Sequence, residues 1–400
     1  MEVMKKAQIF LRVLRQNGMA AVFRRVHKSQ RLRWYRRRGQ KLNCRFGWRS
    51  QRPILVIESD DWGAEHIPGP KALAAIKAVD GFPAESVSNF DSLETAEDVE
   101  RLCDVLNSCE DGDKKPAVIT ANFVMANPDY SAIRENDFRV FKPKLIDEGW
   151  NHEADGQALW REYRAGIENN LIVPQLHGIV HFCPDEWLQR LRQADAVSLK
   201  AFDWKMIGEH EDAAGIGIQS MAPIYHADAK VIKQLVNDGA QAFKRIFGMD
   251  SITTIAPCYG WRSPETEQAF LAHNIRVMQS REYQHLPGGN VKLHYTGERG
   301  PGGMLYLVRN CMLEPISAGT TVEQCISQIV WAFEHNFPAI LCSHRINYTS
   351  RVATEVRDKG LAVLNSVLKQ VKEKYSDVEF LSSDELVLKI LSGKQTDSFV

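Results

Sequence analysis

Apolar and polar residues follow two alternating patterns along the chain beyond residue 52. Short apolar runs predict strands that are buried on both faces; they cover residues 53–57, 116–123, 171–176, 251–257, 275–280, 304–308 and 338–343. Segments with apolar residues at three- and four-residue spacing lie between several of these runs and predict amphipathic helices, for example TAEDVERLCDVLNSC and VEQCISQIVWAFEH. Strands that alternate with helices predict an α/β fold with a largely parallel sheet.

About seven mostly parallel strands over this length favour one (β/α) barrel-like domain over residues 53–400, after an N-terminal extension over residues 1–52. Hydrophobic residues make up 44% of the 400 residues, so the chain can bury a substantial core. It holds no apolar run of about 18 residues, and Arg12 and Arg15 interrupt the apolar stretch near its start, which is unlike a secretory signal. We therefore expect a soluble cytoplasmic protein, whose eight scattered cysteines stay reduced.

The extension is strongly basic, although the whole chain has no net charge. It holds 16 of the 50 Lys and Arg residues but only one of the 50 acidic residues, so the remainder is acidic. Apolar residues at helical spacing within it predict a basic amphipathic helix; they are Val3, Ala7, Phe10, Leu11 and Leu14. Such a helix can associate with an anionic membrane, here the inner membrane face, or it can be a solvated arm or pack on the acidic body. Only charge favours nucleic acid as a partner, so we expect none.

Polar residues follow the predicted strands at the positions where parallel α/β sheets bind ligands. Asp60 and Asp61 end the first strand, and His177 and His181 follow the third at a spacing of four residues. The stretch APCYGWRSP, residues 256–264, follows the fourth strand, and His344 follows the last apolar run.

One carboxylate and two histidines can hold a catalytic metal and leave positions open for water. This would explain two adjacent aspartates, because one can bind the cation while its neighbour accepts a proton from water. Each piece alone has another explanation: paired aspartates often cap helices, and a single histidine at a strand end is more often a core residue. Four polar motifs that all follow predicted strands are harder to explain as helix caps and core residues.

This order of motifs resembles the polysaccharide deacetylase family, metal-dependent enzymes built on a distorted (β/α) barrel. The resemblance covers roughly residues 53–345. It implies that Asp60 is the general base, that Tyr259 contributes its backbone N–H to the oxyanion and that His344 is the general acid. It implies a metal site made of Asp61, His177 and His181.

Two departures from the family pattern make this chain a divergent member. Glu58 and Ser59 stand where the first motif usually begins with Thr-Phe, and Ala256 fills the position of the arginine that normally orients the base. Arg262, six residues further on, is a candidate replacement. A hydrogen-bonding partner fixes the orientation of a catalytic group. With Ala256 in place of this arginine, the sequence does not say what orients Asp60 or sets its pKa.

The expected activity is removal of an acetyl group from an N-acetylated sugar of a polysaccharide or its precursor. Zinc is the first choice of cation, and cobalt, nickel, manganese and iron remain open, as do the sugar and the choice between N- and O-deacetylation. Four residues beside the motifs are candidates for substrate binding or, for the aromatic ones, for core packing: Trp62, Trp261, Arg262 and Tyr348. Lower-ranked candidates are His66, Arg309 and Glu314. The competing functions are a non-catalytic carbohydrate-binding relative and a membrane-associated interaction protein.

Overall fold

The structure is a computed structural model, and it describes residues 30–80, 82, 86–151, 154–207, 228–255, 263–286 and 290–392. The third-motif loop, residues 256–262, lies outside these ranges, as does the N-terminal stretch 1–29. Ala256, Tyr259, Trp261 and Arg262 therefore lie outside the described residues.

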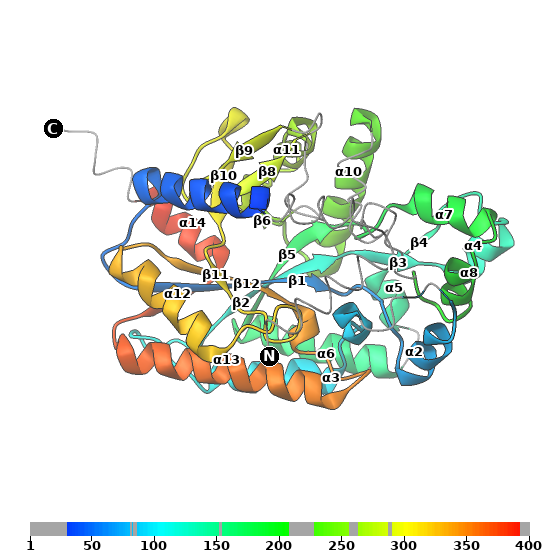
Figure 1. Cartoon of the computed structure of the whole chain (residues 1–400), viewed down its shortest axis with the longest axis horizontal. Helices are drawn as coiled ribbons and strands as arrows, with labels where there is room; N and C mark the ends of the chain where they lie inside the picture. The colour runs from blue at the N-terminus through cyan, green and yellow to red at the C-terminus, as the bar shows by residue number, and fades with distance from the viewer. Residues whose placement is uncertain are drawn as a thin grey trace.

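Parallel strands form one curved sheet at the centre of the molecule (Figure 1). In chain order they are β1 (Ile54–Trp62), β2 (Ile119–Val124), β5 (Ile172–Gly178), β6 (Thr253–Thr254), β7 (Val277–Ser280), β10 (Leu305–Val308), β11 (Cys311–Met312) and β12 (Ala339–His344). Across the sheet the order is β10-β7-β6-β5-β2-β1-β12-β11, and β13 (Glu379–Leu381) also pairs with β1. The strands therefore follow one another around the sheet in chain order, as in a (β/α) barrel.

The barrel has a seam where the two edge strands meet. β10 ends at Val308 and β11 begins at Cys311, so only Arg309 and Asn310 connect the two edges of the sheet. This link can span roughly 10 Å, so the two edges must lie close together although no ladder pairs them among the described residues. The predicted distorted α/β barrel is thus confirmed. Each of the seven predicted runs coincides with a strand, while the short strands β11 and β13 gave no apolar run of their own.

Alternate residues of β1 face the inside and the outside of the barrel. Leu55 and Ile57 belong to the large outer core, which packs against the helices. Ile54 and Val56 belong to an inner core with residues from β7, β10, β12, β13 and α14 (Ser383–Ser392). Further along β1, the same inward positions are taken by Glu58 and Asp60. The barrel interior is therefore apolar towards the start of the strands and polar towards their carboxyl ends.

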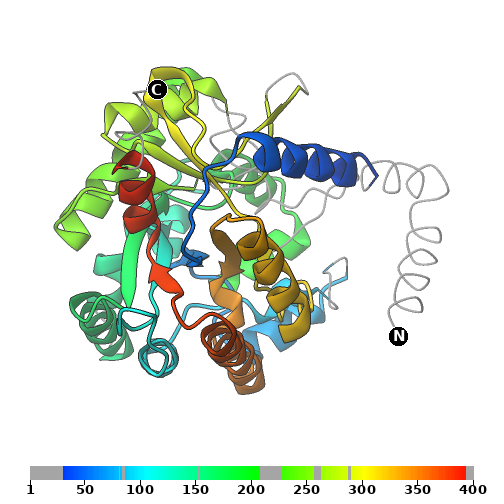
Figure 2. The same cartoon turned by 90° about the vertical axis from the view of Figure 1, so that its left-hand side faces the viewer.

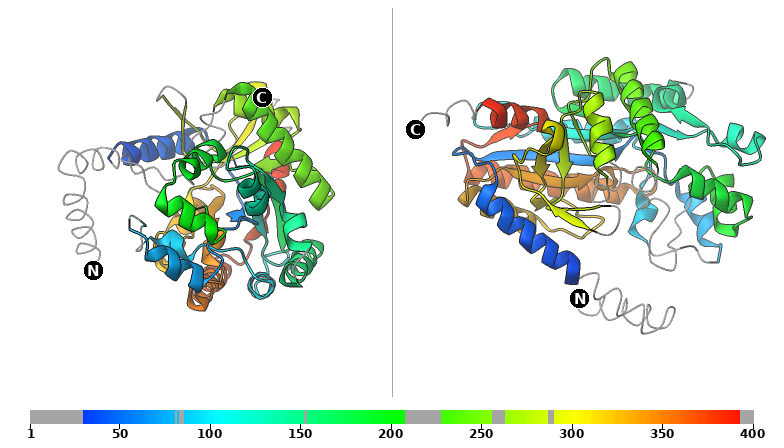
Figure 3. Two further views of the ribbon diagram at one scale, coloured as in Figure 1. Left: turned by 90° about the vertical axis from the view of Figure 1, so that its right-hand side faces the viewer. Right: turned by 90° about the horizontal axis from the view of Figure 1, so that it is seen from above.

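Helices cover the outside of the sheet (Figures 2 and 3). The longer ones are α3 (Ala96–Asn107), α6 (Ala154–Glu168), α10 (Ala229–Phe247), α12 (Val322–Glu334) and α13 (Thr354–Lys374). The shorter ones are α2 (Pro70–Lys77), α4 (Tyr130–Glu135), α5 (Ile146–Asn151), α7 (Pro184–Arg192), α8 (Ala196–Asp203) and α11 (Pro264–Ala272). Capping boxes at Thr95 and Thr321 start α3 and α12. Two antiparallel strand pairs lie outside the main sheet. One is β3 (Ala126–Pro128) with β4 (Pro143–Leu145), which are connected through α4, and the other is β8 (Tyr283–His285) with β9 (Val291–Leu293).

The described part of the basic extension packs on the barrel. A helix over residues 30–46 lies along the outer surface (Figures 1 and 2). A Cβ at its Gly39 would come within 2.4 Å of the Glu282 Cβ, so only glycine permits this close approach. The Thr296 N–H donates to Asn43 Oδ1 at 2.9 Å, and Trp48 packs on the inner core. Packing on the body is thus observed for residues 30–52, and the boundary at residue 52 remains a prediction.

The helix predicted from Val3 to Leu14 lies outside the described residues. Among the helices that the structure does describe, none combines the length and the apolar character needed to cross a bilayer.

Candidate metal and catalytic site

The carboxyl end of β1 is distorted in a way that lets two consecutive aspartates serve one site. Neighbouring residues of a regular strand point to opposite faces. Here Asp61 has a φ of 73°, in the left-handed region, and the pairing of β1 with β2 shifts its register between Ser59 and Trp62. Such a backbone costs of order 1–3 kcal/mol and is typical of functional sites. As a result, Asp60 approaches His344 while Asp61 approaches His177 and His181.

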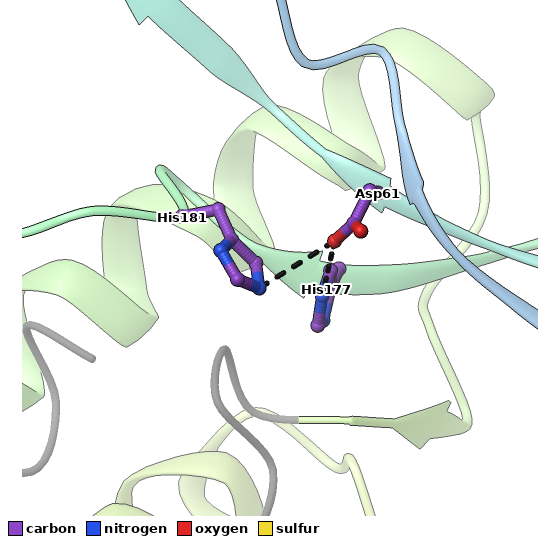
Figure 4. A group of neighbouring side chains, drawn as sticks. All are labelled: Asp61, His177 and His181. Atoms are coloured by element: carbon purple, nitrogen blue, oxygen red, sulfur yellow. Dashed lines mark hydrogen bonds and ion pairs between the residues drawn. The ribbon is translucent and has the colours of Figure 1, made fainter. Parts of the chain in front are cut away.

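Asp61, His177 and His181 converge from two strand ends (Figure 4). The Asp61 Oδ1 lies 3.2 Å from His177 Nε2 and 3.4 Å from His181 Nε2. Ligand atoms that surround a tetrahedral zinc at 2.0–2.2 Å lie roughly 3.3–3.6 Å from one another. The spacing of these atoms therefore fits a small divalent cation.

The protonation of the two histidines also fits a cation. The His177 Nδ1 lies 2.7 Å from the Ile255 carbonyl oxygen, and an Nδ1–H that donates there leaves the Nε2 lone pair directed at Asp61. Burial lowers the pKa of His181 to about 4, so this ring is neutral near pH 7 and can act as a ligand. Asp61 remains ionised because the neighbouring histidines outweigh burial and hold its pKa well below the usual value.

Arg309 clamps Asp60 from the barrel seam. Its Nη1 donates to Asp60 Oδ2 at 2.6 Å and its Nη2 to Asp60 Oδ1 at 2.7 Å, while its Nε donates to Glu58 Oε2 at 2.7 Å. All three side chains are buried, with at most 4% of any residue exposed. Burial alone would raise the pKa of Asp60, but the guanidinium lowers it to about 2. Asp60 is therefore an ionised carboxylate with a fixed orientation.

An arginine thus orients Asp60, although by resemblance Ala256 stands where the family has its third-motif arginine. It comes from β10 and the seam, not from the third-motif loop, whose Arg262 lies outside the described residues. Sequence reasoning ranked Arg309 low. The available signal was the alternation of β1, which places the carboxylates of Glu58 and Asp60 on one buried face that requires a cation.

Neutral polar side chains complete the polar end of the barrel interior. The Asn122 Nδ2 donates to Asp60 Oδ1 at 2.8 Å, and the Gln279 Nε2 donates to Asn122 Oδ1 at 3.0 Å. The Gln279 Oε1 in turn accepts from Arg309 Nη2 at 2.9 Å. Because each buried group has a partner, the network holds Asp60 more rigidly than a single ion pair would.

His344 forms a pair with Glu314 on the other side of Asp60. The His344 Nδ1 donates to Glu314 Oε1 at 2.5 Å, and its Nε2 lies 3.8 Å from Asp60 Oδ2. The second oxygen of Glu314 accepts from Asn347 Nδ2 at 3.0 Å. Burial lowers the pKa of His344, but the Glu314 carboxylate outweighs it and raises this pKa well above the ordinary value. His344 therefore carries a proton on Nε2 near neutral pH.

Glu314, Cys342 and His344 also have the spacing of a metal-ligand group. However, the Arg309 Nη1 lies 3.6 Å from the Cys342 sulfur, and a protonated His344 offers no lone pair. These positive charges disfavour a cation there, so we interpret Glu314 and His344 as a hydrogen-bonded pair.

Two of the aromatic candidates are core residues. Trp62 and Tyr348 are each 1% exposed and stack on one another, with ring centroids 6.2 Å apart. Neither ring presents a face to a ligand, so their assignment to sugar stacking is wrong and core packing, the alternative, holds. His66 is partly buried, with its Nδ1 3.6 Å from Asp91 Oδ2.

Comparison of this chain with known proteins shows similarity of structure but not of sequence. No family model matches the sequence, and no curated protein matches it. A putative polysaccharide deacetylase from Mycobacterium smegmatis is 12% identical with a TM-score of 0.46, covering 89% of this chain and 96% of that one.

Two further solved structures are a carbohydrate esterase family 4 pseudoenzyme from Bacillus anthracis and a family 4 carbohydrate esterase from Streptomyces lividans in complex with acetate. The first is 9% identical with a TM-score of 0.37 and covers 84% of this chain and 66% of that one. The second is 7% identical with a TM-score of 0.35 and covers 82% and 90%. These neighbours include the family that the motifs resemble, and at such identities they carry no information about activity.

Proposed function

We propose that this protein is a metal-dependent hydrolase that removes the acetyl group from an N-acetylated sugar of a polysaccharide or its precursor. The observation that carries the proposal is the arrangement of three groups at one end of the barrel. Asp61, His177 and His181 converge on one point, a clamped Asp60 lies beside them, and a protonated His344 faces Asp60. An acid and an ionised base beside a metal-ligand group are the parts that amide hydrolysis needs.

Asp61 Oδ1, His177 Nε2 and His181 Nε2 would hold the cation, with zinc as the first choice. A divalent cation there supplies a Lewis acid, which makes water acidic enough to lose a proton near neutral pH and stabilises negative charge on the attacked carbonyl.

Asp60 and His344 have complementary roles in the proposed reaction. Asp60 accepts the proton of the attacking water, and Arg309 keeps its carboxylate ionised and oriented for this step. His344 donates its Nε2 proton to the nitrogen of the leaving group, because an amine leaves poorly unless it is protonated. Glu314 fixes the His344 ring and its charge. By resemblance, we assign the oxyanion contact to the backbone N–H of Tyr259.

The experiment that tests this function measures metal content and acetate release together. The purified protein should bind about one equivalent of zinc, cobalt, nickel, manganese or iron and should release acetate from a panel of N-acetylated sugars. Sugar binding without acetate release at any metal loading would contradict the proposal. It would favour the non-catalytic carbohydrate-binding relative instead.

Asp60→Asn should separate binding from chemistry. The amide cannot accept a proton from water, so we expect kcat to fall at least about 100-fold while the metal stays bound. Acetate release and metal content should be measured on the same preparation, with Asp104→Asn on the exposed face of α3 as the matched control. If Asp60→Asn loses the metal and Asp61→Asn keeps it, the two roles are exchanged.

Glu314→Gln should move the pH dependence of the reaction. Glutamine can still accept the His344 hydrogen bond but removes the negative charge that raises the pKa of this histidine. The pKa of His344 should therefore fall, and the alkaline limb of the kcat profile should shift to lower pH. An unchanged alkaline limb would exclude His344 as the general acid.

Peripheral membrane association and a cytoplasmic location remain proposals for the whole chain. Exposed basic residues on the helix over 30–46 support the first; they include Arg31, Arg33, Arg37, Arg38 and Lys41. Screening should weaken any such attachment steeply as salt is added.

A further inference from the structure

The helix α14 packs its apolar side chains on the inside of the barrel. Leu386, Val387 and Ile390 belong to the inner core. The start of the helix is fixed by a reciprocal pair of bonds: the Ser382 N–H donates to Glu385 Oε2 at 2.9 Å, and the Ser382 Oγ accepts from the Glu385 N–H at 3.2 Å. The first turn of α14 therefore has a defined position relative to the strands.

This first turn is bound to three different strands of the barrel. The Ser383 N–H donates to Thr120 Oγ1 on β2 at 2.9 Å, and the Ser383 Oγ donates to Glu58 Oε1 on β1 at 2.7 Å. The Gln175 Nε2 on β5 donates to Asp384 Oδ2 at 2.8 Å. Ser383 and Glu58 are each 0% exposed, so bulk water does not compete for the bond between them.

Ser383 begins a chain of hydrogen bonds that ends at Asp60. Glu58 accepts from Ser383 on Oε1 and from the Arg309 Nε on Oε2. Arg309 in turn donates to both oxygens of Asp60 through its two Nη groups. Glu58 is thus held at both carboxylate oxygens, by α14 on one and by the guanidinium on the other.

Glu58 depends on Ser383 because a buried carboxylate needs hydrogen-bond donors. Burial raises the pKa of Glu58, while the charge of Arg309 and the hydrogen bonds from Arg309 and Ser383 oppose this rise. Without the serine hydroxyl, Glu58 must take up a proton or turn towards another donor, and either change weakens its bond to the Arg309 Nε. A guanidinium is planar and rigid, so a shift at Nε moves both Nη groups that hold Asp60.

We propose that Ser383 is a positioning residue for Asp60, which it keeps in its catalytic orientation through Glu58 and Arg309. The inference rests on the proposed deacetylase function and deepens it. It makes the first turn of α14 part of the support of the general base. Ser383 does not belong to the metal-ligand group, so its loss should impair proton transfer and leave metal binding intact.

The kinetic test compares Ser383→Ala and Ser383→Cys with wild type. Cysteine keeps the size of the side chain but is a weaker donor. The matched control is Ser392→Ala, which removes a hydroxyl from the exposed last residue of the same helix. Loss of one hydrogen bond to a buried charged group should lower kcat about tenfold in Ser383→Ala and less in Ser383→Cys. KM and metal content should stay unchanged, and Ser392→Ala should match wild type.

A double-variant cycle tests the route through Glu58. In Glu58→Met the side chain keeps a similar length but offers no oxygen to Ser383. Ser383→Ala should therefore cause no further loss of kcat in this background. A wild-type kcat in Ser383→Ala would overturn the inference, as would an equal loss in both backgrounds or a loss that comes from lower metal content or a higher KM.

A measurement that needs no activity follows the Arg309 Nε–H itself. Its NMR signal in isotope-labelled protein is identified by its absence in Arg309→Met, and its exchange with solvent reports how firmly Glu58 holds it. This exchange should be about tenfold faster in Ser383→Ala than in wild type and Ser392→Ala. Should wild type release acetate from no N-acetylated sugar, the proposed function fails and the exchange rate decides the inference separately. A faster rate in Ser383→Ala then supports the link from Ser383 to Arg309, and an unchanged rate refutes it.

Discussion

Replacing Arg309 by Met is expected to lower the free energy of unfolding by about 3–5 kcal/mol, the range for breaking a buried ion pair by removing one partner. The substitution leaves the side chains of Glu58 and Asp60, which are 0% and 1% exposed, without the guanidinium that donates hydrogen bonds to both of them. Urea unfolding should show the change as a lower midpoint. Arg101→Met breaks an exposed pair with Glu97 on α3 and should cost less than about 1 kcal/mol.

The same variant should also impair catalysis at neutral pH. Arg309 depresses the pKa of Asp60 in the folded protein, so its contribution to stability is present above the unfolded pKa of aspartate and is lost as pH falls towards about 2. Without Arg309, burial and Glu58 would raise the pKa of Asp60. The value of kcat should then fall as the pH is lowered through this raised pKa, because a protonated Asp60 cannot accept a proton from water. The double variant Glu58→Gln/Arg309→Met should regain part of the stability and little of the activity, because the base stays unclamped. A stable, fully active Arg309→Met protein would rule out the clamp.

The sequence predicted the sheet well because each strand is buried on both faces and is therefore an uninterrupted apolar run. It also predicted that Asp60, Asp61, His177, His181 and His344 would meet, because the carboxyl ends of parallel strands lie at one end of a barrel. The strand β11 could not be predicted from the sequence, for a physical reason. Its two residues are too few to form a pattern, and it exists because Asn310 and the seam place it beside β12.

Interactions between distant residues mark the limit of sequence reasoning. Arg309 and Asp60 are 249 residues apart, and nothing local shows that the strand carrying the arginine ends opposite β1. The pair of Glu314 with His344 depends in the same way on β11 and β12 being neighbours. Trp62 and Tyr348 show the reverse error. They lie one residue after Asp61 and four residues after His344 in the chain, but both rings are buried in the core and stack on one another.

Replacing Asp61, His177 or His181 by Ala should each remove most of the bound metal. Three protein ligands leave the cation one or more positions for water, so a site with two ligands competes poorly with water and buffer. Metal content after dialysis and acetate release should fall together in each variant. His66→Ala is the matched control for metal content, because His66 lies next to this group but is paired with Asp91 and contributes no ligand atom to it.

The His177→Ala and His181→Ala variants distinguish a metal site from a hydrogen-bonded cluster. If the two rings merely hydrogen-bond to Asp61, their removal should leave metal content unchanged and alter only stability. If they are ligands, both should lose metal, and His177→Ala should also leave the Ile255 carbonyl without its 2.7 Å partner and so lose more stability than His181→Ala. Stoichiometric metal in both histidine variants would refute the assignment, because the two ligands that remain in each variant should compete poorly with water and buffer for a divalent cation.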